Sequence, residues 1–132
     1  MRASKTKIKG APTKQQAETL ELVSPILTAV VTEVRELSKK KQDGILSVLK
    51  VRSINRILGD VQSTLKDDPS LRYLDLLEED DLPQNSDAVL ILTQWEAAVK
   101  QHKDKHQKFD SISAQAWVWN LADGGTLRAR NR

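Results

Sequence analysis

The sequence of 132 residues contains no cysteine, which excludes disulfide bonds, thiol catalysis and every zinc or iron–sulfur site built on cysteine. It has only five glycines, and none lies in a pattern that cradles nucleotide phosphates or forms the nucleophile turn of a hydrolase. No apolar run approaches the roughly 18 residues that cross a bilayer, and the basic start lacks the apolar stretch of a secretory signal. We therefore expect a cytoplasmic protein with no membrane contact and no cofactor.

Charge is distributed unevenly along the chain. Residues 1–66 hold 13 basic against 6 acidic side chains, residues 67–99 hold 1 against 9, and residues 100–132 hold 7 against 3. The net charge of +3 therefore combines a basic, an acidic and a second basic segment. Such segregation suits contact with a nucleic acid, contact with a charged protein, or mutual neutralisation within the fold.

Apolar residues recur at helical spacing over most of the chain, whereas signals for strands are nearly absent. Thr13 and Gln16 form a capping-box pattern at the start of an amphipathic helix over residues 13–41. Pro25 either kinks this helix or breaks it in two. Further amphipathic patterns cover residues 51–65 and 88–109, with Ser86 and Asp87 as the expected cap of the last helix.

A shorter helix of about three turns is expected after Asp68-Pro69-Ser70, where an N-cap residue precedes a proline. The sequence thus predicts an all-α single domain, a small bundle of four or five helices over residues 13–110. A disordered basic arm over residues 1–12 precedes the bundle, and an aromatic-basic segment over residues 111–132 follows it.

His102 and His106 stand four residues apart on the last predicted helix, a spacing at which two imidazoles can share one metal ion. A zinc site needs at least a third ligand, and the sequence offers none in a suitable place. We therefore predict no metal site and interpret the histidines as a semi-polar end of the core face. The acidic run over residues 78–81 is interpreted as a solvated loop, with a patch for a basic partner as its functional alternative.

Trp117 and Trp119 are two of the five aromatic residues in the chain. In a helix over residues 114–121 their side chains would point about 200° apart, so that one ring could close the end of the bundle. In an extended segment both rings would share one face and could anchor a partner, or stack on unpaired bases. The sequence leaves both conformations open.

We expect a non-enzymatic accessory or adaptor subunit that binds a protein partner, or a second copy of itself. Its predicted protein-binding residues are Trp117, Trp119, Arg128 and Arg130. The alternative is a nucleic-acid-associated helical protein that neutralises phosphates with its basic termini and a polar helix face. For that alternative the predicted contact residues are Lys5, Lys7, Lys9, Arg52 and Arg56.

Overall fold

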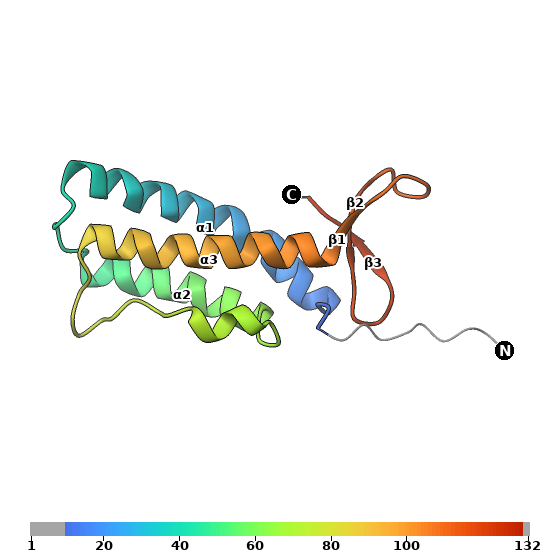
Figure 1. Cartoon of the computed structure of the whole chain (residues 1–132), viewed down its shortest axis with the longest axis horizontal. Helices are drawn as coiled ribbons and strands as arrows, with labels where there is room; N and C mark the ends of the chain where they lie inside the picture. Colours follow the sequence, from blue (N-terminus) through green and yellow to red (C-terminus); the bar gives the residue numbers. More distant parts are fainter. Residues whose placement is uncertain (1–9, 131–132) are drawn as a thin grey trace.

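The computed structural model describes residues 10–130, which form three α-helices, a short 3₁₀ helix and a small antiparallel sheet. Helices α1 (Lys14–Lys40), α2 (Val48–Thr64) and α3 (Asn85–His106) lie side by side along the long axis of the molecule (Figure 1). The sheet follows at one end, with strands β1 (Gln107–Asp110), β2 (Ala116–Asn120) and β3 (Thr126–Arg128) in that order. The expected all-α bundle of four or five helices is therefore wrong.

Local sequence signals set the limits of α1. The Thr13 hydroxyl accepts a hydrogen bond from Gln16 N at 3.1 Å, and the Gln16 side chain accepts one from Thr13 N at 2.9 Å. This confirms the predicted capping box. The helix continues through the exposed Pro25, so the alternative of two separate helices is wrong.

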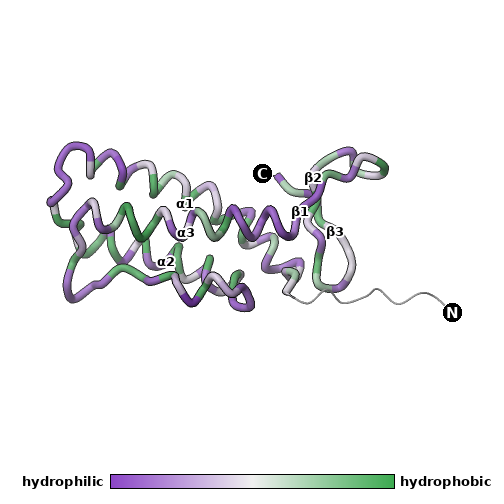
Figure 2. Tube along the Cα trace, viewed as in Figure 1, coloured by the Kyte–Doolittle hydropathy of each residue, from purple (hydrophilic) through white to green (hydrophobic). Residues whose placement is uncertain are grey.

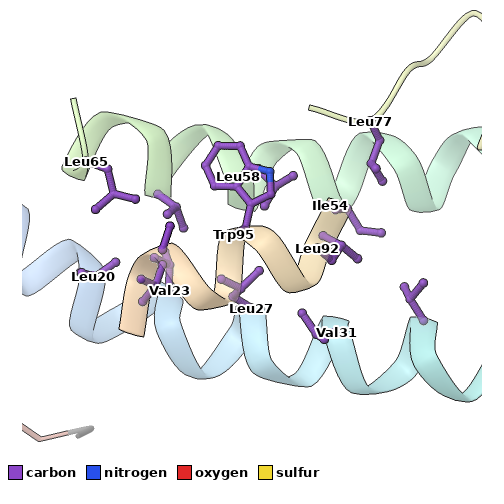
Figure 3. Packing of buried hydrophobic residues seen from close by; sticks show 14 of the residues in the cluster. Leu20, Val23, Leu27, Val31, Ile54, Leu58, Leu65, Leu77, Leu92 and Trp95 are labelled. Atoms are coloured by element: carbon purple, nitrogen blue, oxygen red, sulfur yellow. The ribbon is translucent and has the colours of Figure 1, made fainter. Parts of the chain in front are cut away.

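The core lies between the three helices, and Trp95 of α3 is the largest side chain that the helices bury in it. Figure 3 shows this ring between Leu58 of α2 and Leu27 of α1. The apolar stripes predicted for the first two helices supply most of the other buried residues. They include Leu20, Val23, Val31 and Val34 of α1 and Val51, Ile54 and Val61 of α2.

The expected helix after Pro69 is replaced by a single 3₁₀ segment, η1 (Pro69–Tyr73), and an extended strap over residues 74–84. Asp68 caps η1 as predicted, by accepting a hydrogen bond from Ser70 N at 2.9 Å. Beyond it, the Asn55 side chain bonds both the backbone N and O of Leu77, at 2.9 and 2.8 Å. These tertiary hydrogen bonds hold the strap extended and insert Leu77 into the core.

Helix α3 begins at Asn85 without any side-chain cap, so the predicted cap at Ser86 is wrong. Its first amides are satisfied by another part of the chain: Asn85 N donates to Gly44 O at 2.7 Å and Ser86 N to Gln42 O at 3.0 Å. A Cβ at Gly44 would lie 2.8 Å from the Asn85 side-chain nitrogen, so a side chain there would displace the Asn85 amide. Carbonyl groups of a distant loop thus replace the local cap.

The C-terminal sheet was not predicted from the sequence. Helix α3 passes directly into β1, so the last residues assigned to a helix over 88–109 belong to a strand. In the β1–β2 hairpin Gln107 faces Trp119 and Phe109 faces Trp117, and β3 extends the sheet with Leu127 opposite Trp119. The segment around the two tryptophans is therefore extended, and the helical alternative is wrong. Within residues 10–130, no helix combines the length and apolarity that a bilayer crossing requires.

Candidate protein-binding surface

Trp119 fixes the sheet to the helices. Its ring is fully buried, and its Nε1 donates to Glu21 Oε1 at 2.7 Å. The second carboxylate oxygen of Glu21 accepts from the backbone N of Arg130 at 3.1 Å. One buried carboxylate of α1 thus holds both β2 and the chain just after β3. The Trp119 side chain, which was predicted to contact a partner, is buried in the fold.

A buried polar cluster lies beside this anchor at the end of α3. His102 Nδ1 lies 3.1 Å from Asp68 Oδ2, and these two side chains are only 3% and 4% exposed. Lys105 Nζ approaches the same carboxylate oxygen at 3.6 Å. The His102 ring lies 6.2 Å from the Trp119 ring and 4.6 Å from the His106 ring, centroid to centroid. Through Asp68, His102 and Trp119, the cluster connects the start of η1 with α3 and β2.

The pKa values of these groups follow from burial and from their partners. Burial alone would raise the pKa of Asp68, but hydrogen bonds from Ser70 and His102 and the charge of Lys105 lower it to about 2. Burial lowers the pKa of His102, and Asp68 opposes this shift only in part. Burial also lowers the pKa of His106. We infer that both histidines are neutral at pH 7.

The neutral His102 donates from Nδ1 to Asp68, which leaves Nε2 as an unprotonated acceptor. This Nε2 atom is buried and has no hydrogen-bond partner among residues 10–130. In the same part of the chain, no group of three or more metal-ligating side chains comes together. His102 is buried at the end of the core, and the half-buried His106 lies beside it.

The exposed end of the hairpin carries an apolar surface. Phe109 and Trp117 are cross-strand neighbours whose rings meet edge to face at 6.0 Å between centroids. Phe109 is 52% and Trp117 37% exposed, and Ile112 in the connecting loop is 90% exposed. We call these three side chains the hairpin surface. The hairpin loop extends beyond the ends of the helices, with a hydrophobic stretch at its outer end (Figures 1 and 2).

Asp110 fixes the loop that presents Ile112. One carboxylate oxygen accepts hydrogen bonds from the backbone N of Ile112 at 3.1 Å and of Ser113 at 3.0 Å, and the other accepts from Ala114 N at 3.4 Å. These backbone hydrogen bonds lower the pKa of Asp110. Gln115 then turns the chain back into β2 with a positive φ of 51°. A loop held in one conformation loses little entropy when a partner binds it.

Basic side chains lie on the other face of the sheet from Phe109 and Trp117. Lys108, Val118 and Arg128 are successive cross-strand neighbours on the opposite face of the sheet, and both cations are exposed. Arg128 and Arg130 also line a groove of about 660 Å³ between α1 and β3. Of the four predicted protein-binding residues, Trp117, Arg128 and Arg130 are therefore at the surface, and only Trp119 is in the core.

The structure describes only two of the residues predicted to contact nucleic acid, Arg52 and Arg56. Lys5, Lys7 and Lys9 lie outside the described residues. Arg52 Nε pairs with Glu79 Oε1 at 3.1 Å, so this cation belongs to a neutral pair with the acidic strap, while Arg56 is exposed on the same helix. Sequence reasoning missed Phe109, which it placed in the core of a helix, and Ile112. The signal available was the short apolar run over residues 116–119, rich in Trp and Val, which is followed by the turn residues Asp123-Gly124-Gly125.

No protein-family model matches the chain, and comparisons with curated proteins and with solved structures likewise give no match. The surface itself is therefore the basis for the function proposed below.

Proposed function

We propose that this protein is a non-enzymatic interaction module of the cytoplasm that binds a protein partner through the hairpin surface. The observation that carries the proposal is the display of Ile112, 90% exposed, on a loop fixed by Asp110 beside the Phe109–Trp117 pair. Large apolar side chains on rigid supports are typical of the central contacts in protein interfaces.

The anchoring of the sheet supports this role. Burial of Trp119 and its hydrogen bond to Glu21 join the hairpin to α1, and the chain of α3 continues without a break into β1. The hairpin surface therefore keeps a fixed orientation relative to the helices. Binding to such a preorganised surface costs less conformational entropy than binding to a mobile tail.

The surface also indicates the chemistry of the partner. The exposed apolar side chains favour a cleft lined by apolar residues. The same surface offers little to a nucleic acid, because its most exposed residue is an isoleucine. We propose no catalytic role for Asp68 and His102, because both side chains are almost fully buried.

Replacement of Ile112 by aspartate is expected to weaken partner binding by more than about tenfold, because a charge would enter the centre of an apolar contact. The matched control is Leu49→Asp, which places the same charge on a 76% exposed leucine of α2. Tagged protein recovered from its native cells, with nuclease treatment of half the sample, would measure the effect. Recovery of a stoichiometric protein by wild type and L49D but not by I112D is the expected result.

Equal recovery of that protein by I112D and wild type would contradict the proposal. Partners that disappear after nuclease treatment, with binding of labelled DNA or RNA that falls steeply as salt rises, would favour the nucleic-acid alternative instead.

Replacement of Asp110 by alanine is expected to weaken the same binding severalfold while leaving the helices intact. The substitution removes the acceptor of three backbone hydrogen bonds, so the loop that presents Ile112 becomes disordered. Amide hydrogen exchange over residues 111–115 would show the loss of order, and titration with the recovered partner would show the loss of affinity. Unchanged protection of these amides in D110A would argue against a loop held by this carboxylate.

A further inference from the structure

A cavity toward the end of the molecule opposite the sheet combines apolar walls with carboxylates. It measures about 780 Å³ and lies between the loop before α2, the strap over residues 74–84 and the first turns of α3 (Figure 1). Its apolar walls include Ile45, 59% exposed, and Leu76, 43% exposed. We call this feature the end cavity. Its volume lies within the range of about 300–1,000 Å³ typical of pockets that enclose a ligand. Its acidic residues are Asp75, Glu78, Asp81 and Asp87.

The walls of the end cavity are held in place by contacts between distant parts of the sequence. Leu46 N donates to Pro83 O at 3.1 Å, which joins the loop before α2 to the strap. On the other side, the Asn55 side chain bonds the backbone of Leu77. A ligand therefore meets an opening that is already formed, and binding it requires little ordering of these loops.

The carboxylates of the end cavity are not neutralised within the described fold. Among residues 10–130, none of the four forms an ion pair, and no lysine or arginine lines the opening. Arg52 pairs with Glu79, a strap residue that does not line the cavity. A segment with several positive charges and an apolar side chain would complement both the carboxylates and the exposed apolar walls.

The sequence contains a segment of that composition at residues 5–9, KTKIK, in which Ile8 stands between two lysines. No acidic residue occurs before Glu18, and Arg2 adds a further positive charge. The KTKIK segment lies outside the part of the chain that the structure describes. Its composition is therefore the complement of the end cavity in charge and in apolar character.

The KTKIK segment lies too far from the end cavity of its own molecule to fill it. It precedes Gly10, at the sheet end of α1, whereas the loop that carries Ile45 follows the other end of this helix (Figure 1). A helix of 27 residues is about 40 Å long. Residues 5–9 extend at most about 18 Å from Gly10, even when fully stretched. We infer that the end cavity binds the KTKIK segment of a second copy, so that the protein self-associates.

Such an interface is heterologous, because each copy contributes a different part of the chain. The contact leaves a KTKIK segment unbound at one end of an assembly and a cavity at the other, so it extends into an open chain or closes into a ring. Salt should weaken it, since part of the attraction arises between exposed charges. The inference goes beyond the proposed function, because neither element belongs to the hairpin surface.

The first test measures the binding of a labelled peptide of residues 2–10 to the full chain by fluorescence anisotropy. The host is K5Q/K7Q/K9Q, whose own segment no longer competes for the cavity. Adding E78Q/D81N to this host should weaken peptide binding about tenfold, because two charge pairs at the cavity are lost. Equal affinity of the peptide for the two hosts would overturn the inference.

The second test is sedimentation velocity over a concentration series. The mean mass of the wild type should rise with concentration, and it should rise less at high salt. K5Q/K7Q/K9Q and E78Q/D81N should each remain monomeric. An equimolar mixture of the two should form a 1:1 complex that grows no further, because one variant keeps the cavity and the other keeps the segment.

Two controls make the result specific. E18Q/E33Q removes two exposed carboxylates of α1 and should associate like the wild type. I112D should also associate like the wild type, because the hairpin surface takes no part in this contact. A wild type that stays monomeric at all concentrations, or a mixture without a complex, would overturn the inference. The recovery experiment with I112D is decided separately, so the proposed function and this inference can fail independently.

Discussion

Trp119→Ala is expected to lower the free energy of unfolding by about 3–5 kcal/mol, the usual cost of truncating a fully buried tryptophan. The substitution opens a cavity between the sheet and α1. It also removes the Nε1 donor from Glu21, which would leave a buried carboxylate oxygen with one hydrogen bond fewer. The sheet is thereby expected to separate from the helices before they unfold.

Trp117→Ala is the matched comparison, because it removes the same side chain two residues away on the same face of β2. Trp117 is 37% exposed and its ring meets Phe109 edge to face, so the expected cost is about 1 kcal/mol. Urea unfolding followed by far-ultraviolet circular dichroism would measure both variants. Similar losses of stability would contradict the separate roles of the two tryptophans, an anchor and a contact residue.

The second expected result is a loss of stability in acid that begins with the histidines and continues with Asp68. The folded state lowers the pKa of His102 and His106 below their usual 6.5, so the unfolded chain takes up protons first as pH falls through that value. Stability is then lost, because the state that binds more protons is favoured at lower pH. The contribution of these groups is fully present only above about pH 6.5.

Asp68 acts in the same direction at lower pH. Its folded pKa of about 2 lies below the usual 3.8, so its contribution is present above pH 3.8 and is lost as pH falls toward 2. A shift of this size corresponds to about 2 kcal/mol. Asp68→Asn is therefore expected to cost about 2 kcal/mol at pH 7 and to remove the loss below pH 4.

Denaturant unfolding of wild type and D68N at a series of pH values would test this. The exposed Asp60→Asn, on α2, is the control and should retain the acid dependence of the wild type. An acid limb that is the same in D68N and wild type would show that the Asp68–His102 pair contributes no pH-dependent stability.

The helical part of the fold could be predicted because its signals are local. The apolar stripe of α1, the capping box at Thr13 and the proline turn after Asp68 depend on residues within a few positions of one another. The strap over residues 74–84 could not be predicted in this way. Its sequence has helical spacing, but Asn55, 22 residues earlier, takes the backbone hydrogen bonds of Leu77 that a helix would need.

The candidate surface was predictable in position but not in detail. The concentration of tryptophan beside arginine pointed to the C-terminal segment, and Trp117, Arg128 and Arg130 are at the surface there. Which tryptophan would be exposed depended on the length of α3. Because the helix ends at His106 and β1 starts at once, Trp119 meets α1 while Trp117 lies farther out, beside Phe109.

The sequence by itself determined the three long helices, their core faces, the absence of cysteine chemistry and the segregation of charge, since each follows from composition or short-range periodicity. Only the tertiary structure decided that the last segment forms a sheet, because strand pairing joins residues that no helical period connects. It also decided where the charge resides. The pairing of Ile45 with Gln84 places the acidic residues Glu78 and Asp81 at one end of the molecule, and the docking of Trp119 on Glu21 places the exposed hairpin at the other.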